Sequence, residues 1–159
     1  MQKHTPKNLE KSRMENGLEA LRPFIGQELS MVPSPVAHWL KGTLQEISES
    51  GMKIAFTVRE DMTNPARILH GGIIATMLDD VMGITVMVKH NPDLSTFYST
   101  INLHVDYLAS TREGATVIAS SNVIKAGNKI ANVEGWLHDS SGKLLAHATC
   151  NMLKVEMRT

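Results

Sequence analysis

The sequence has 159 residues, and its 16 basic and 16 acidic side chains give a formal net charge of zero. A single domain of this length buries a sizeable core without disulfides or metals. Zero net charge removes the electrostatic footprint of sequence-independent nucleic-acid binding, so we expect no nucleic-acid partner. The single cysteine excludes an internal disulfide framework, and the charged start MQKHTPKNLEKSR lacks an apolar signal region, which together predict a cytoplasmic protein.

The first part of the chain, residues 1–35, is expected to form a helix and an extended connection. Apolar residues recur at helical spacing between positions 14 and 25, so residues from about 8 to 22 predict an amphipathic helix that Pro23 ends. Pro33 and Pro35 then predict an extended segment. The remaining residues, 36–159, are expected to form one domain without repeats or linkers.

That domain begins with two strand-like segments, Val36 to Ile47 and Met52 to Val58, which predict a hairpin with a turn at 49–51. A polar loop leads to HGGIIATMLDDVMGITVMVKH, which is apolar on nearly every face. Asp79 and Asp80 near its centre would be very costly in a bilayer. We therefore predict a helix enclosed by the rest of the fold, and no membrane association.

Four further strands are predicted at 97–109, 115–126, 129–139 and 144–155, with turn signals at 112–114, 127–128 and 140–142 between them. Strands on both sides of one very apolar helix indicate an α+β fold. A long, mostly antiparallel sheet that curls around this central helix would bury it on all sides.

A stripe of small and polar residues follows one face of the central helix. Gly72, Thr76, Asp79 and Gly83 are spaced by four, three and four residues, which places them on the same face. An ionised Asp79 among apolar neighbours needs hydrogen bonds, water or a cleft. Position alone leaves two interpretations open, a functional carboxylate or one that a neighbouring backbone or hydroxyl group satisfies.

The helix is preceded by His70-Gly71-Gly72. The first backbone N–H groups of a helix lack intrahelical partners and lie at the positive end of its dipole, so this end can hold a developing oxyanion. The structural alternative is that the glycines only permit a tight turn, with His70 as a cap or a packed side chain.

Asn64 followed by LHGGIIATMLDD resembles the active-site segment of the PaaI-like hotdog thioesterases, in which an Asn, an HGG and an Asp nine residues after the His recur. The resemblance runs from about Ala37 to Val155 and includes a K-x-G-x-K segment that begins at Lys125. It implies the hotdog fold and hydrolysis of an acyl-CoA thioester. A medium-chain or aryl acyl group is our expectation for the substrate.

The resemblance also implies a role for each matching residue. Asp79 would be the general base or the nucleophile toward the thioester, and the Gly71 N–H would polarise its carbonyl. Asn64 and His70 would position water and the loop, and Thr100 takes the place of a hydroxyl near the attacking water.

Further substrate contacts are expected on the helix stripe and at the turn after position 125, where cationic side chains suit the phosphates of coenzyme A. Ordinary solvated turn charges are the structural alternative for the two lysines. The expected substrate-binding residues are Gly72, Thr76, Lys125, Gly127, Asn128 and Lys129. The acyl tunnel is expected to be shaped by Met77, Met82, Met87, Ile84 and Phe97.

Asp80 departs from the family pattern as a second carboxylate. One residue step of about 100° rotates it off the stripe, so Asp79 is the expected catalytic acid and Asp80 an interfacial or structural residue. Gly71 and Asp79 are separated by about 12 Å along the helix, too far to act on one carbonyl. Each site should therefore combine Asn64, His70 and Gly71 of one subunit with Asp79 of another. This predicts a homodimer with shared active sites, and a tetramer as a pair of such dimers.

The sequence indicates no cofactor and no metal. It has no phosphate loop or dinucleotide fingerprint, and coenzyme A enters only as part of the substrate. His104 and Asp106 share a strand face but lack a third ligand at a recognisable spacing. Cys150 has no base nearby in sequence and is expected to be a buried apolar thiol.

Two alternative functions remain. One is a non-catalytic acyl-CoA binding module, although binding alone needs neither Asp79 nor the HGG helix end. The other is a hotdog enoyl-CoA hydratase or dehydratase. Its D-x-N-P-x-H loop is faintly echoed, with incorrect spacings, by Asp61, Asn64, Pro65 and His70.

Overall fold

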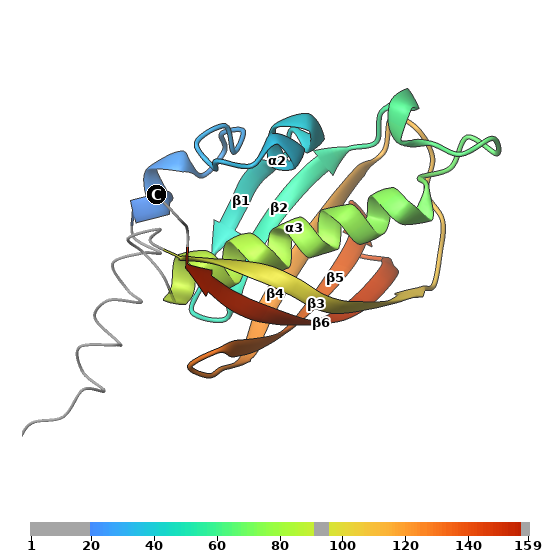
Figure 1. Ribbon diagram of the computed structural model, residues 1–159. Helices are drawn as coiled ribbons and strands as arrows, with labels where there is room; N and C mark the ends of the chain where they lie inside the picture. The colour runs from blue at the N-terminus through green and yellow to red at the C-terminus, as the bar shows by residue number, and fades with distance from the viewer. Residues whose placement is uncertain (1–19, 91–95, 157–159) are drawn as a thin grey trace, which may run out of the picture.

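The computed structural model describes residues 20–90 and 96–156, in which a six-stranded antiparallel sheet curves around one long helix (Figure 1). Along the sheet the strand order is β1-β2-β4-β5-β6-β3. The strands are β1 (Thr43–Ile47), β2 (Gly51–Thr57), β3 (Thr96–Tyr107), β4 (Thr116–Ala126), β5 (Ile130–Asp139) and β6 (Leu144–Glu156). This arrangement confirms the predicted α+β hotdog fold.

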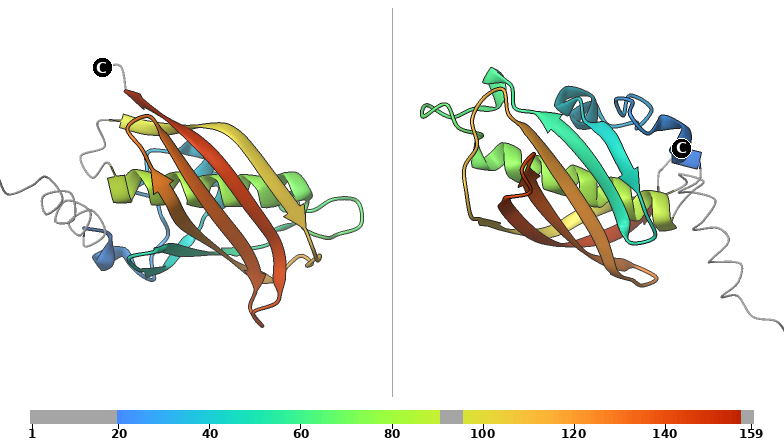
Figure 2. Two further views of the ribbon diagram at one scale, coloured as in Figure 1. Left: turned by 90° about the horizontal axis from the view of Figure 1, so that it is seen from below. Right: turned by 180° about the vertical axis from the view of Figure 1, so that it is seen from behind.

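The central helix α3, Gly71–His90, lies across the concave side of the sheet, as the views from below and behind show (Figure 2). Ten of its twenty residues are buried. By length and by a mean hydropathy of 1.5 it could cross a membrane, but half of that apolar window is buried inside the fold, as in a core helix. The less buried positions follow the stripe predicted from the sequence, because the sheet covers only the opposite face. The expectation that the fold would bury this helix on all sides is therefore wrong.

Two buried polar side chains tie α3 to the sheet. The Thr85 hydroxyl and the Ser121 hydroxyl of β4 form a hydrogen bond, and the Lys89 ammonium donates to the Glu49 carbonyl in the turn between β1 and β2. Burial lowers the pKa of Lys89, against a smaller opposite effect of Glu49. Such bonds satisfy polar groups that would otherwise destabilise the core.

The start of the predicted first strand is wrong. Instead of an extended connection and a strand from Val36, the chain forms a short helix, α2 (Pro35–Leu40). Ser34 caps this helix by accepting the Ala37 N–H at 3.2 Å, and Pro35 occupies its first turn, where a missing N–H costs nothing. The hairpin of β1 and β2 begins only at Thr43 and is otherwise as predicted.

The chain before α2 packs against β1. Gly26 N–H donates to the Leu44 carbonyl at 2.7 Å and Leu29 N–H to the Gly42 carbonyl at 2.9 Å, while Leu29 and Val32 reach the core. A single 3₁₀ turn, η1 (Arg22–Phe24), precedes them. Most of the predicted helix from about 8 to 22 lies outside the described residues.

Candidate active site

The loop that enters α3 is built on Asn64. After the short turn η2 (Glu60–Met62), the Asn64 side-chain oxygen accepts the Ala66 N–H at 2.9 Å and the Ile68 N–H at 3.4 Å. The backbone of the loop is held as well, since His70 N–H donates to the Met62 carbonyl at 2.9 Å. Asn64 therefore fixes the shape of the loop in front of the helix.

His70 is the cap of α3. Its Nδ1 accepts the Gly72 N–H at 2.9 Å, so this nitrogen carries a lone pair and the imidazole is held by the helix that it caps. The Gly71 N–H makes no hydrogen bond with any part of the chain that the structure describes. An N–H that lacks a partner at the positive end of a helix is suited to an anionic oxygen.

Asp79 lies two turns further along α3 and is held by the edge strand β3. Thr100 donates its hydroxyl to Asp79 Oδ1 at 2.7 Å. The family resemblance implies a hydroxyl at Thr100 near the attacking water but does not predict this bond. Behind them, Cys150 of β6 is buried, and its pKa is raised to about 11 by burial and by the negative charge of Asp79. The thiol therefore stays protonated at neutral pH. Its burial confirms the prediction of a buried apolar thiol.

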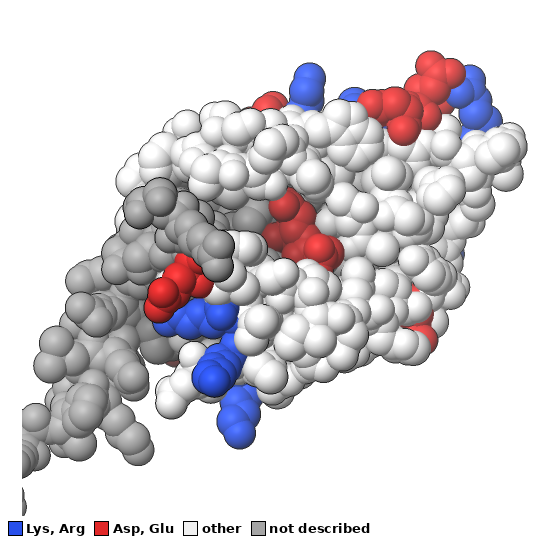
Figure 3. All heavy atoms as spheres, in the orientation of Figure 1, with Lys and Arg blue, Asp and Glu red and all other residues white. Residues whose placement is uncertain are grey.

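Asp79 borders a cavity of about 290 Å³. Most of its wall is apolar, and acidic atoms are visible in the hollow at the middle of this face (Figure 3). The lining residues come from the N-terminal segment, α3, β3 and β6: Val32, Pro33, Ser34, Asp79, Asp80, Gly83, Ile84, Met87, Phe97, Tyr98, Thr100 and Met152. No Lys or Arg is among these described residues.

Asp80 borders the same cavity as Asp79, which corrects the expectation that one helix step removes it from this surface. The cavity wall covers a wider arc of α3 than the narrow stripe. Burial and then the neighbouring charge of Asp79 raise the pKa of Asp80 to about 6. The cavity therefore contains a second carboxyl group, that of Asp80, whose pKa is raised above its ordinary value.

The residues expected to shape an acyl tunnel are divided between this cavity and the core. Ile84, Met87 and Phe97 line the cavity, whereas Met77 and Met82 are fully buried in the core and face the sheet side of α3. The sequence did not predict Val32, Pro33 and Ser34 as cavity residues, because they precede the region of family resemblance. Their only sequence signal was the helix-start pattern of Ser34 and Pro35.

The other predicted binding residues lie away from this cavity. Gly72 donates its N–H to His70 Nδ1 at the start of α3, and Thr76 donates its hydroxyl to the Gly72 carbonyl at 2.8 Å. Lys125, Gly127, Asn128 and Lys129 form the end of β4 and the turn to β5. That turn lies at the end of the molecule where α3 finishes, opposite to Gly71 (Figures 1 and 2).

Within one chain, the two predicted halves of the site are thus separate. Asn64, His70 and Gly71 do not line the cavity that Asp79 and Thr100 border. This agrees with the helix spacing, by which Gly71 and Asp79 are about 12 Å apart along α3.

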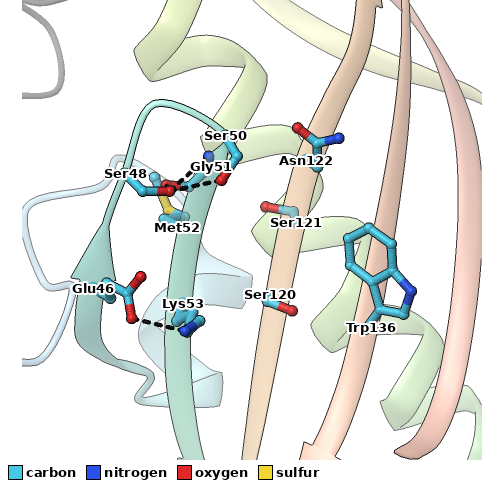
Figure 4. Close-up of a pocket in the computed structure, with 10 residues that line it drawn as sticks. All are labelled: Glu46, Ser48, Ser50, Gly51, Met52, Lys53, Ser120, Ser121, Asn122 and Trp136. Carbon is cyan, nitrogen blue, oxygen red and sulfur yellow. Dashed lines mark hydrogen bonds and ion pairs between the residues drawn. The ribbon is translucent and has the colours of Figure 1, made fainter.

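A second hollow, of about 360 Å³, lies between the β1–β2 hairpin and the outer face of β4 and β5 (Figure 4). Four of its polar side chains form two pairs: Lys53 with Glu46 at 2.7 Å and Ser48 with Ser50 at 2.8 Å. No metal cluster occurs among residues 20–90 and 96–156, and His104 and Asp106 form only an exposed pair at 3.3 Å. Neither feature competes with the Asp79 cavity as a reaction site.

The curved sheet and its enclosed helix place the chain among hotdog-fold proteins. The family model described as the Thioesterase superfamily matches residues 66–146, about half of the chain, including all of α3. The chain therefore belongs to the thioesterase superfamily, which confirms the family predicted from the residues around Asn64 and Asp79.

Curated relatives carry more specific names. The chain is 35% identical over 97 residues to the medium/long-chain acyl-CoA thioesterase YigI of Escherichia coli K12, a match that covers 54% of this chain and 62% of that protein. It is 27% identical over 92 residues to human acyl-coenzyme A thioesterase 13, covering 56% of this chain and 62% of that protein. Each match thus spans less than two thirds of the relative.

Solved structures share the fold over most of the chain. A phenylacetic acid degradation-related protein from Ralstonia eutropha JMP134 superposes with a TM-score of 0.69 at 25% identity, over 89% of this chain and 98% of that one. A thioesterase protein from Streptococcus pneumoniae TIGR4, solved with coenzyme A, gives a TM-score of 0.65 at 16% identity, over 74% of this chain and 91% of that one. At such identity the second likeness concerns the fold alone.

Proposed function

We propose that this protein is an acyl-CoA thioesterase that hydrolyses a medium-chain or aryl acyl-CoA to the free acid and coenzyme A. The observation that carries the proposal is Asp79, which is hydrogen-bonded by Thr100 at the wall of an apolar cavity. The same helix begins with a Gly71 N–H that lacks a partner among the described residues. The names of the curated relatives support the same reaction.

In the proposed reaction, Asp79 acts either as a general base toward water or as the nucleophile that attacks the thioester carbon. Thr100 holds Oδ1, so Oδ2 can accept a proton from water as the water oxygen adds to the thioester carbon. The alternative route begins with attack by the carboxylate itself and gives an anhydride that water then opens. In both routes the Gly71 N–H stabilises the oxyanion, the C–S bond breaks, and the thiolate takes a proton to leave as coenzyme A.

The cavity supports an uncharged acyl group of moderate size. Its volume of about 290 Å³ is roughly that of ten water molecules, and Ile84, Met87 and Met152 give it flexible apolar walls. The described lining residues include two carboxyl groups and no Lys or Arg, which disfavours an acyl group that ends in a carboxylate. We therefore expect dicarboxylic acyl-CoA esters to be poor substrates.

We further propose that the active form is a homodimer joined along β3. This edge strand has twelve residues, of which only Thr96 is buried, and exposes Phe97 and Ile101. A long exposed edge pairs readily with another strand. A two-fold antiparallel pairing would place the two α3 helices in opposite directions, so that the start of one lies toward the end of the other. Gly71 of one subunit and Asp79 of the other would then serve one thioester.

In this dimer the opposite ends of the two subunits become neighbours. The β4–β5 turn of one subunit would lie near the α3 start of the other. This supports Lys125 and Lys129 as contacts for the coenzyme A phosphates, since the described residues that line the Asp79 cavity include no Lys or Arg. Pairing of two dimers into a tetramer stays a prediction.

Removal of the oxyanion donor tests the reaction. Gly71→Pro deletes the N–H and adds the pyrrolidine ring, and proline suits the first position of a helix. We expect kcat to fall by about 10²- to 10³-fold, the usual effect of losing one oxyanion donor. Gly71→Ala is the matched control, since it keeps the N–H and its Cβ would meet only the Tyr107 ring, at 3.3 Å.

Mixing of variants tests the shared site. Gly71→Pro and Asp79→Asn dimers, each inactive, are unfolded together and refolded. Statistical mixing gives half heterodimers with one intact site of two, so about a quarter of the wild-type activity should return. No recovery of activity, with mixed dimers verified by mass, would refute the shared site. The thioesterase proposal would not be affected by that result, because the single variants test it separately.

A further inference from the structure

Tyr107, the last residue of β3, touches the start of α3. Its hydroxyl donates to the Gly71 carbonyl at 3.1 Å. Its ring lies against Gly71 so closely that a Cβ on that glycine would be 3.3 Å from Cε1 and 3.5 Å from Cζ. No part of the HGG motif or the family segment pointed to this residue.

The backbone around this contact is well anchored. After Tyr107 the chain stays on β6, since Leu108 N–H donates to the Leu145 carbonyl at 2.9 Å. The loop before α3 is joined to the same region, since Leu69 N–H donates to the Thr111 carbonyl at 2.9 Å. The phenol therefore extends from a fixed strand end to a fixed helix start.

Gly71 and Gly72 need such a restraint. Glycine has the largest conformational freedom of all residues, so two in succession allow neighbouring peptide planes at the start of α3 to turn about their Cα atoms unless other contacts hold them. His70 Nδ1 holds the Gly72 N–H, which shares a peptide plane with the Gly71 carbonyl, and the His70 carbonyl, which shares a plane with the Gly71 N–H, accepts from the next turn of the helix. The Cα of Gly71 is the joint between these two planes. The Tyr107 hydroxyl and ring hold Gly71 from the other side, at its carbonyl and its Cα.

We propose that Tyr107 is a positioning residue, which aligns the Gly71 N–H for the oxyanion of the thioester reaction. Tyr107 touches neither the substrate nor the reacting atoms in this account. It acts through Gly71, because an oxyanion donor is effective only when it is oriented before charge develops. This inference rests on the proposed thioesterase function.

The same strand then serves both parts of the machinery. Thr100, near the middle of β3, orients the Asp79 carboxylate, and Tyr107, at its end, orients the Gly71 peptide. An edge strand that pairs with a second subunit would thereby hold the oxyanion donor of one site and the acid of the other.

The test is Tyr107→Phe, which removes the hydroxyl and keeps the ring against Gly71. Loss of one hydrogen bond of ordinary strength predicts a decrease of about 3- to 10-fold in kcat. KM should stay within about twofold, and so should the Kd for an S-alkyl coenzyme A thioether, which has no carbonyl for the oxyanion site to bind.

Ser48→Ala is the matched control, since it removes a hydroxyl contact with the Gly51 carbonyl in the remote β1–β2 turn. This variant should keep wild-type kcat. Tyr107→Phe with unchanged kcat, or with kcat, thioether affinity and thermal stability reduced together, would refute the positioning role. If the wild-type protein hydrolyses no ester, the proposed function itself is refuted. If the wild type is active and Tyr107→Phe has the same kcat, only the positioning role is refuted.

Discussion

Replacement of Asp80 by asparagine should stabilise the folded protein at neutral pH. Burial raises the pKa of this carboxyl group from 3.8 to about 6. A folded-state pKa above the unfolded value means that the folded state binds more protons between these two values. The stabilising effect of the protonated form is complete below pH 4 and is lost as the pH rises through 6. Asparagine has similar size and no charge, so it avoids this loss.

The size of the effect follows from the pKa shift of Asp80. A shift of about two units corresponds to about 3 kcal/mol of unfolding free energy at pH 7.5, as an upper value. For a chain of this length that gain raises Tm by about 6 to 12 °C. Urea unfolding and thermal melts at pH 4 and pH 7.5 measure it. Equal stability at pH 7.5, or a gain of the same size at both pH values, would refute the assignment of Asp80 as a buried, ionised group.

Three other outcomes follow from particular contacts. Thr100→Val removes the 2.7 Å hydrogen bond to Asp79, so kcat should fall about 10- to 100-fold; steady-state thioesterase rates with a retained fold check this, and an unchanged kcat would contradict it. Cys150, with its pKa raised to about 11 by burial, should react with a thiol reagent at pH 8 only after denaturation, and labelling of the native protein would refute its burial. Gly51→Ala would place a Cβ 1.7 Å from the Ser121 carbonyl oxygen, so it should destabilise the fold by more than about 4 kcal/mol; a wild-type Tm would contradict this close strand contact.

Much of the fold follows from local sequence patterns. α3 is apolar on nearly every face and the long strands alternate, so their positions come within a few residues of the sequence expectation. α2 was missed because Val36 and Trp39 in a short segment do not distinguish a helix of six residues from a strand. The Ser34–Pro35 pair is a local sign of a helix start, which the interpretation of Pro33 and Pro35 as an extended segment did not use.

The site is predictable only where a motif is local. The positions of Asn64, His70, Gly71 and Asp79 lie in one short segment, so their pattern could be recognised. Contacts that join distant segments could not be derived from periodicity: Ser34 at the cavity and the Tyr107 hydroxyl on Gly71 depend on how the chain closes. The prediction for Asp80 is wrong for a different reason, since the cavity wall covers a wider arc of α3 than the predicted stripe.

The proposed chemistry depends most directly on Asp79. The decisive measurement is thiol release from a panel of short, medium, long, aryl and dicarboxylic acyl-CoA esters, with wild type and Asp79→Asn compared at equal oligomeric size. We predict wild-type hydrolysis that is best with medium-chain or aryl esters and that falls by at least about 10³-fold in the folded variant. Hydrolysis that survives in Asp79→Asn, or none of any ester by folded wild type, would contradict the account.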